Sequence, residues 1–380
     1  MTDPKRIEKG LFWDRAWGLA HGCRPRSEAC AHCWSVRESM ARQNHPNTNI
    51  AKRHANILDV KTRHFNGRVN LQWDLLDLPH YTRKSKSWAV WDDLFYGDDE
   101  DRQWCERHGI EFLPVTEQFI IGALDTMIAC PQHQFFVLTK RAKRMREIVT
   151  HYCNTFGLDN LPANIVGMVT AENQGWADAR IPELLSTPYT TRGVIIEPML
   201  GPVDLSHFPL GKPQPISTSP HGGAWYWCKD CGRWNNQKPT TILGRCGNCG
   251  SWNWVRRLDR RLDLVIAGGE SGTGARPTHP DNFRALRDEC VKYGVKFFFK
   301  SWGEWAPFDC GYDVCKDERY KTGKMPQLFV PLGGEAFSVP LTYMQKEQYP
   351  PADAMNRVGK RRSGRILDGR TWDELPEAGQ

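Results

Sequence analysis

The stretch HQFFVLTKRAKRMREIVTHYC, residues 133–153, contains the unit from which much of the chain is built. Its first half is a nearly continuous apolar run that ends at Thr139, Lys140 and Arg141, which is typical of a strand buried on both faces of a parallel sheet. Its second half, 142–153, has the apolar periodicity of a helix. A buried strand followed directly by a helix predicts a βα unit.

The same unit recurs on both sides of this stretch. We expect further strands at 87–95, 164–173, 192–200, 261–271 and 295–303, with one or two more upstream, for instance around 67–76. Helices are expected at 116–131, 175–188 and 280–294. This alternation predicts an α/β protein with a complete or partial TIM-like (βα) barrel. An open doubly wound sheet is the alternative, because strand order cannot be read from sequence.

Polar residues stand at the carboxyl end of each expected strand. Because these ends meet on one face of a barrel, we expect a polar pocket there. The candidate catalytic residues are Glu172, Glu197 and Lys140. The candidate cofactor-binding residues are Gly268, Gly269, Glu270, Ser271, Arg141 and Lys300.

The segment GGESGTGARP, 268–277, follows a strand and is rich in glycine. Such a turn can bind phosphate through backbone N–H groups, although its spacing matches neither a P-loop nor a dinucleotide fingerprint. A plain flexible turn is the alternative, but Glu270 and Arg276 favour a ligand site.

A cysteine cluster lies in a long insertion after the strand at 192–200. Cys228 and Cys231 form one C-x2-C pair, and Cys246 and Cys249 form a second. Four thiolates in this spacing predict a closed tetrahedral zinc site, a zinc ribbon. The ribbon is expected to be structural, and its tryptophans and arginines permit contact with nucleic acid.

The other cluster stops at three cysteines. Cys23, Cys30 and Cys33 have the spacing C-x6-C-x2-C. A structural zinc site completed by His21 or His32 is one interpretation. The other is a [4Fe–4S] cluster with one iron left open, since such clusters ordinarily take four cysteines. Enzymes that form radicals from S-adenosylmethionine bind that cofactor at an open iron, which favours the second interpretation.

Specific stretches from nearly the whole chain resemble the phage Gp37/Gp68 family, bacterial and phage proteins of poorly defined function. They are the cysteine trio with Trp34, WDDLF (91–95), PQHQFFVLTKRAKRM (131–145), TAENQ (170–174), IIEPMLGPVDL (195–205), VIAGGESGTGARPTHPDNFRALRDEC (265–290), FFFKSWGEW (297–305) and GRILDGRTWDELP (364–376). The family is similar to radical S-adenosylmethionine enzymes in its cysteine trio and barrel-like pattern.

This second similarity has departures. The common radical-enzyme spacing is C-x3-C-x2-C, whereas the first gap here has six residues, although a longer loop closes at small entropic cost. The aromatic residue often found before the third cysteine is replaced by His32, with Trp34 just after. The GGE motif also comes late in the chain, at 268–270.

The chain is expected to divide into three parts. Residues 1–205 and 258–303 form the barrel core with the cysteine loop, 206–257 form the inserted zinc ribbon, and 304–380 form a C-terminal extension that packs on the barrel. The extension includes a basic run, GKRRSGR, at 359–365.

Composition sets the outer limits of the function. The chain has 380 residues, 40% hydrophobic content and a net charge of +7, with no apolar run long enough to span a membrane. Thirteen cysteines and no secretory leader favour the reducing cytosol, so the compartment is expected to be cytoplasmic. The pI of about 8.7 is compatible with a nucleic-acid partner.

We therefore expect a radical S-adenosylmethionine-type enzyme that acts on a nucleic acid or a modified base. Its cofactors would be a [4Fe–4S] cluster, S-adenosylmethionine and zinc, with an electron donor such as a flavodoxin or ferredoxin. The alternatives are a non-catalytic, zinc-dependent nucleic-acid-binding protein and a barrel enzyme without radical chemistry. The sequence leaves the substrate and the oligomeric state open.

Overall fold

The computed structural model describes residues 2–59, 61–210, 260–331 and 352–377, together with three short strands between 226 and 256. Those three strands, β10 (Tyr226–Cys228), β11 (Trp234–Asn235) and β12 (Trp254–Arg256), form a small antiparallel sheet. The remaining predicted zinc ligands, Cys231, Cys246 and Cys249, lie outside the described residues.

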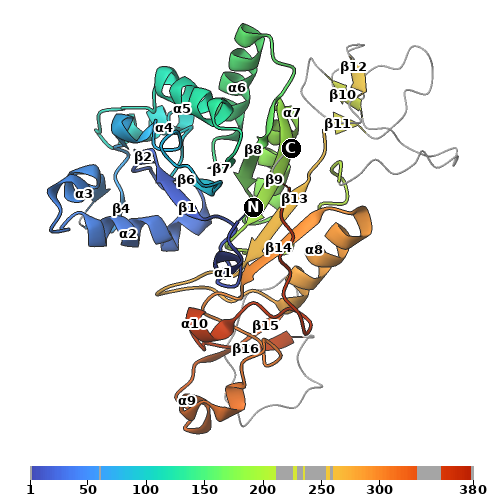
Figure 1. Cartoon of the computed structure of the whole chain (residues 1–380). Coiled ribbons are helices and arrows are strands. Elements are labelled where there is room, and N and C mark those ends of the chain that lie inside the picture. Colours follow the sequence, from blue (N-terminus) through green and yellow to red (C-terminus); the bar gives the residue numbers. More distant parts are fainter. Residues whose placement is uncertain are drawn as a thin grey trace, which may run out of the picture.

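A seven-stranded parallel sheet forms the centre of the molecule, in the order β1-β6-β7-β8-β9-β13-β14. Its strands are β1 (Arg15–Gly18), β6 (Ser87–Trp91), β7 (Gln134–Thr139), β8 (Leu161–Thr170), β9 (Tyr189–Ile196), β13 (Leu264–Gly268) and β14 (Lys296–Ser301). Because neighbours in the sheet follow chain order, the sheet curls in one direction as a half barrel (Figure 1). The structure is a partial TIM-like barrel, which confirms the predicted fold class in its partial form.

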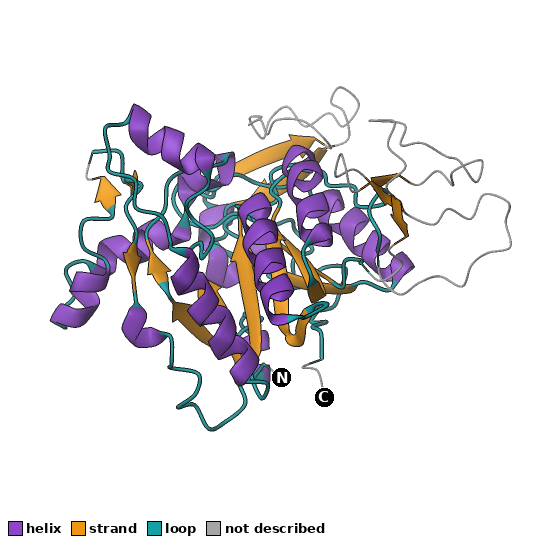
Figure 2. Ribbon diagram, turned by 90° about the horizontal axis from the view of Figure 1, so that it is seen from above, coloured by secondary structure: helices purple, strands orange, loops and turns teal. Residues whose placement is uncertain are grey.

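Helices alternate with these strands and cover the outer face of the sheet (Figure 2). They are α4 (Asp99–Arg107), α5 (Glu117–Ala129), α6 (Ala142–Phe156), α7 (Gln174–Ser186) and α8 (Pro280–Tyr293). Their starts follow ordinary capping rules: the Thr116 hydroxyl accepts from Phe119 N–H, and the Asn173 side chain accepts from Trp176 N–H. Gly157 and Gly294 end α6 and α8 in the left-handed conformation.

The upstream strand of the barrel is not where the sequence pattern placed it. Residues 70–71 form β5, which pairs antiparallel with β2 (Ala20–His21) in a separate small sheet. The first barrel strand is instead β1, which pairs in parallel with β6. The stretch 67–76 is wrong as a barrel strand because only two of its residues pair, and Trp73–Leu75 turn into a short 3-10 helix.

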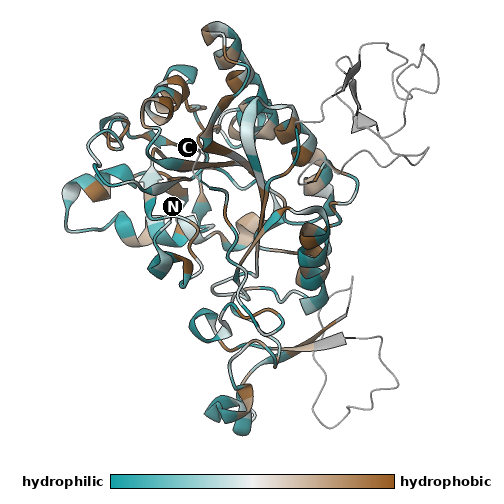
Figure 3. Cartoon of the chain, turned by 45° about the vertical axis from the view of Figure 1, so that its right-hand side comes forward, coloured by the Kyte–Doolittle hydropathy of each residue, from teal (hydrophilic) through white to brown (hydrophobic). Residues whose placement is uncertain are grey.

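Side chains on the strands alternate between two apolar cores. Phe135 and Val137 pack in the large core shared with the outer helices. Phe136 and Phe298 point inward, where the ring of Phe12 lies 5.1 Å from that of Phe136. Figure 3 shows hydrophobic colouring concentrated on the central strands and hydrophilic colouring on the surrounding elements. The inner core lies beneath the carboxyl ends of the strands and leaves that face of the half barrel open for a site.

Smaller elements surround the half barrel. On the amino-terminal side they are α1 (Pro4–Ile7), α2 (Trp34–Arg42), α3 (Thr48–Arg53), β3 (Leu58–Asp59) and β4 (His64–Phe65). On the carboxyl-terminal side they are α9 (Glu318–Lys321), β15 (Gln327–Pro331), β16 (Ala352–Asn356) and α10 (Lys360–Ser363). The final segment covers the edge strand β14: Phe299 N–H donates to the Trp372 carbonyl, and Glu374 N–H donates to the Phe297 carbonyl. None of the described helices is long and apolar enough to cross a bilayer.

Candidate functional site

The inward side chains of the strands change from apolar to charged toward the carboxyl ends. Residues two apart on a strand point to the same face, so an apolar inward residue is followed by a polar one beyond the core. The pairs are Leu138 and Lys140, Ile195 and Glu197, and Phe298 and Lys300. The sheet itself therefore places a ring of charged groups above an apolar floor.

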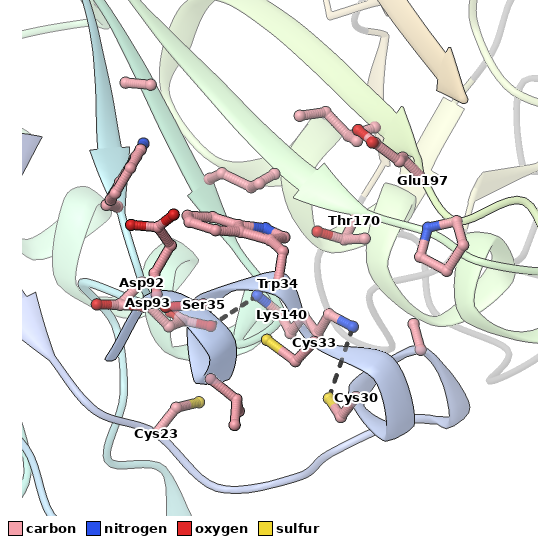
Figure 4. Close-up of a pocket in the computed structure, with 18 of the residues that line it drawn as sticks. Cys23, Cys30, Cys33, Trp34, Ser35, Asp92, Asp93, Lys140, Thr170 and Glu197 are labelled. Carbon is pink, nitrogen blue, oxygen red and sulfur yellow. Dashed lines mark hydrogen bonds between the residues drawn. The ribbon is translucent and has the colours of Figure 1, made fainter. Parts of the chain in front are cut away.

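These groups line a pocket of about 690 Å³ at the carboxyl-end face. The sequence-predicted residues on its wall are Cys23, Cys30, Cys33, Lys140, Arg141, Glu197, Gly269, Glu270, Ser271 and Lys300. Figure 4 shows the three cysteines together on one side of the pocket, with Lys140 close to Cys30 and Glu197 farther away. Residues from opposite ends of the chain thus converge on one cavity.

The three cysteines come from one continuous segment after β2. Cys23 lies in the loop, Cys30 in a 3-10 helix (Glu28–His32), and Cys33 immediately before α2. All three are partly exposed. Of the other cysteines whose side chains the structure describes, none lines this pocket, so no fourth thiol accompanies the trio in the described part of the chain.

The three thiols differ in their electrostatic surroundings. Burial raises the pKa of the Cys23 thiol to about 12, although Arg141, which donates to its Sγ at 3.3 Å, acts against this. Burial also raises the pKa of the Cys33 thiol to about 11. At Cys30 the effect of burial is outweighed by the charge of Lys140 and by backbone N–H groups, which together lower the pKa of that thiol. The Lys140 ammonium lies 3.8 Å from the Cys30 sulfur.

A buried ion network lies behind Cys23. Asp101 of α4 is fully buried and accepts from Arg24 Nε at 2.6 Å and from Arg141 Nη2 at 2.8 Å. Burial acts to raise the pKa of this carboxyl, but the two guanidinium groups outweigh it and hold the pKa well below its usual range. Arg141 also pairs with Asp93 at 3.0 Å. The network fixes the cysteine loop to the barrel through charges that are removed from water.

A second network surrounds Lys140. Its ammonium pairs with Glu172 and donates to the Ser27 hydroxyl at 2.8 Å. Glu172 is fully buried, accepts from Ser27 Oγ at 2.6 Å, and pairs with Arg180 at 3.0 Å. Glu172 therefore lies behind Lys140 and does not line the pocket.

Two further ion pairs form the opposite wall. Lys300 donates to both carboxylate oxygens of Glu197, at 2.7 and 2.8 Å. Glu270 accepts from the backbone and the guanidinium of Arg276, the latter at 2.6 and 2.8 Å. Gly269 passes so close to the next strand end that an added Cβ would lie 1.9 Å from the Trp302 carbonyl oxygen. The glycine at this position is thus a packing requirement.

The structure brings most of the sequence-predicted residues together, with two placed differently. Gly268 ends β13 beside Glu197 and Lys300 but does not line the pocket, and Glu172 lies behind it. Sequence reasoning missed Asp101, Arg24 and Ser27. Asp101 belongs to an acidic run, 98–101, that is typical of an exposed helix start, so no local pattern marks it as buried.

Within the described residues, no three His, Cys, Asp or Glu side chains converge closely enough to hold a single metal ion. The three thiols share a pocket wall without meeting at one point. Ligands of a multinuclear cluster bind separate metal atoms, so their sulfurs stand farther apart than around one zinc ion.

Fold and site together define a partial (βα)-barrel protein with a polar pocket and three cysteines at the carboxyl ends of its strands. The chain belongs to the family described as protein of unknown function DUF5131, the phage Gp37/Gp68 family, whose model matches residues 8–376. This confirms the resemblance drawn from the sequence. Neither the curated proteins nor the solved structures include a match.

Proposed function

We propose that this protein is an iron–sulfur enzyme of the radical S-adenosylmethionine type, with Cys23, Cys30 and Cys33 as the ligands of a [4Fe–4S] cluster. The observation that carries the proposal is that these thiols line one pocket with the charged strand ends of the partial barrel. When bound, the cluster and cofactor would supply reductive cleavage of S-adenosylmethionine and a radical that abstracts hydrogen. The electron would come from a donor such as a flavodoxin or ferredoxin.

The donor set fits a cluster better than a zinc ion. Zinc requires sulfurs at about 2.3 Å from a common centre, and the described residues offer no such convergence. Three thiolates leave one iron of a cubane cluster without a protein ligand, which is where a small-molecule cofactor can bind. The missing fourth thiol in the described part of the chain supports this interpretation.

Charged groups around the thiols favour an anionic cluster. Lys140 lies beside Cys30, and Arg141 lies beside Cys23. Each cation is held by a buried carboxylate, Glu172 for Lys140 and Asp101 for Arg141, so neither is free to turn away. Such hydrogen-bonded groups outside the ligand set orient the ligands and stabilise the charge they carry.

The rest of the pocket offers groups for the cofactor and the substrate. Glu197 and Lys300 can each exchange their mutual ion pair for an amino or a carboxylate group of a bound molecule. Ser271 and the backbone of Gly269 lie on the same wall. Glu172 is assigned to positioning Lys140, because it lies behind the pocket.

The insertion is proposed to hold a separate, structural zinc ion. Cys228, Cys231, Cys246 and Cys249 supply four thiolates in two C-x2-C pairs, which close a tetrahedral shell. This site would have no open position for catalysis.

Anaerobic purification followed by iron, sulfide and zinc analysis tests the proposal. We expect about four irons per chain. Cys30→Ala should lose this iron, whereas Cys315→Ala, which removes an exposed thiol outside the pocket, should retain it. With iron present, dithionite and S-adenosylmethionine should yield 5′-deoxyadenosine. A protein that contains only zinc under strictly anaerobic handling would contradict the proposal.

A further inference from the structure

The charged side chains of the pocket wall are not all paired. Each carboxylate that lines the pocket already has a basic partner within the described residues. These pairs are Glu38 with Arg42, Asp92 with His21, Asp93 with Arg141, Glu197 with Lys300 and Glu270 with Arg276. The wall therefore has no carboxylate left to bind a cationic ligand without breaking an existing pair.

Two cations on the same wall have no such partner. Arg24, Lys140, Arg141 and Lys300 are all paired with carboxylates. Arg37 and Lys360 line the pocket, and neither side chain makes an ion pair or a hydrogen bond with another described residue. Among the described residues these two side chains are therefore the cations of the wall that have no carboxylate within ion-pairing distance; the carboxylates that act on Lys360 from farther away are Glu197, already paired with Lys300, and Glu304, which accepts from Gly272 N–H at 3.1 Å.

Arg37 and Lys360 reach the pocket mouth from different parts of the chain. Arg37 is exposed on α2. Its guanidinium lies against Gly272, because a Cβ added to that glycine would be only 2.6 Å from Arg37 Nη1. Lys360 begins α10, and Arg357 just before it donates to the Gly272 carbonyl at 3.3 Å. Burial and the nearby charge of Lys300 lower the pKa of the Lys360 ammonium; Arg37 acts in the same direction, whereas the carboxylates of Glu197 and Glu304 act against it. Arg37 and Lys360 therefore lie within range of each other's charge.

An aromatic surface accompanies the cations. Trp34 lines the pocket, is 44% exposed, and packs edge-on against Trp91 with ring centroids 4.7 Å apart. Figure 4 shows its indole reaching into the pocket. Cations that follow a phosphate backbone, together with an exposed aromatic ring on which a base can stack, are typical of proteins that bind single-stranded nucleic acid.

We propose that Arg37 and Lys360 bind a backbone phosphate of a single-stranded polynucleotide, with one base stacked on Trp34. The proposal rests on the proposed function only in taking this pocket as the substrate site. Arg361, exposed on the next position of α10, extends the positive surface away from the mouth. DNA and RNA share the phosphate and the base, so the experiment must separate them.

The test uses the full chain and two fluorescein-labelled 20-nucleotide probes of one mixed sequence, one DNA and one RNA. Anisotropy gives the affinity between about 50 and 200 mM salt. A contact to a single-stranded phosphate contributes about 0.7 to the slope of log affinity against log salt. Because the two cations bind one phosphate, Arg37→Ala/Lys360→Ala should lower the slope by about 0.7, which corresponds to roughly fivefold weaker binding at 0.1 M salt when the affinities converge at about 1 M.

The control pair is Lys292→Ala/Lys316→Ala, which removes two exposed cations outside the pocket and should leave both slopes unchanged. Arg37→Lys/Lys360→Arg should retain the wild-type slope, which shows that charge is responsible. Trp34→Ala should weaken binding at least about fivefold without changing the slope, because stacking releases no counterions. The probe that binds the wild-type protein more tightly identifies the sugar.

Three results would overturn the proposal: no binding of either probe at 50 mM salt, a wild-type slope in the Arg37→Ala/Lys360→Ala variant, or an equal loss in the control pair. Since anisotropy does not depend on iron, the outcome is separate from that of the proposed function. If the protein is free of iron but binds through these two cations, this inference stands and the proposed radical chemistry is wrong. If the protein contains iron but does not bind either probe, the proposed function stands and this inference is wrong.

Discussion

Replacing Asp101 with asparagine removes one charge from the buried network behind the cysteine loop and changes the volume of the side chain little. The carboxylate accepts six hydrogen bonds, and the four shortest come from Arg24 Nε at 2.6 Å, Arg141 Nη2 at 2.8 Å and Nε at 3.0 Å, and Gly97 N–H at 2.9 Å. An amide can accept only at its oxygen, so the variant leaves two buried guanidinium groups with less compensation.

The expected loss follows from the burial of both partners. Arg141 is 1% exposed and Asp101 is 0% exposed, and breaking a buried ion pair by removing one partner costs about 3–5 kcal/mol. An unfolding entropy of about 2.1 cal/mol/K per residue amounts to about 0.8 kcal/mol/K for 380 residues. The melting temperature of Asp101→Asn should therefore fall by about 4–6 °C.

Thermal unfolding followed by circular dichroism measures this shift. Asp99→Asn is the matched control, because Asp99 lies two residues earlier in the same helix, is exposed, and has no ion pair within the described residues. If both variants melt within about 1 °C of each other, the network does not stabilise the fold and the reasoning is wrong. Under the proposed function, Asp101→Asn should also retain less iron than Asp99→Asn, since Arg24 adjoins Cys23.

Three other changes test separate parts of the fold. Burial lowers the pKa of His54 to about 4. The contribution of the neutral imidazole to the free energy of unfolding is therefore complete above about pH 6.5, and about 3 kcal/mol of it is lost as the pH falls toward about 4. Urea unfolding at both pH values should show this loss, and His54→Asn should reduce it. Gly269→Ala should lower the melting temperature by several degrees, because the added Cβ would overlap the Trp302 carbonyl oxygen. Gly201→Ala should leave it unchanged, because a Cβ there would have no atom within 4 Å. Phe12→Ala should cost about 3–5 kcal/mol in urea unfolding, since Phe12 fills the inner core of the half barrel; a loss below 1 kcal/mol would contradict that role.

Much of the barrel could be predicted because buried parallel strands are continuous apolar runs that are visible without partners. Six of the seven strands were expected from such runs. β1 escaped because Arg15–Gly18 is only four residues long and contains an arginine at its start. The stretch 67–76 looked more like a strand, yet long-range pairing with β6 selected the shorter segment. Pairing partners are a tertiary property that a local pattern does not contain.

The sequence predicted that the strand-end residues lie at one face of the barrel. It did not predict in which direction each side chain points. Lys140 and Arg141 are neighbours in sequence; Lys140 was a candidate catalytic residue and Arg141 a candidate cofactor-binding residue. Because side chains alternate along a strand, Lys140 continues the inward row of Phe136 and Leu138, whereas Arg141 is almost fully buried against Asp101 and reaches the pocket beside Cys23. Counting this alternation from the buried strand would have separated the two roles.

The same alternation explains the long gap between the first two cysteines. Since Lys140 approaches Cys30 and Arg141 approaches Cys23, one strand end contacts two thiols that lie seven positions apart in the loop. The residues between those thiols hold the loop in place. Arg24 pairs with Asp101, Arg26 pairs with Asp98, and Ser27 donates to Glu172, each at 2.6 Å. A gap shortened to three residues would lose at least one of these contacts, so the length of the loop follows from the distance between two networks on the barrel.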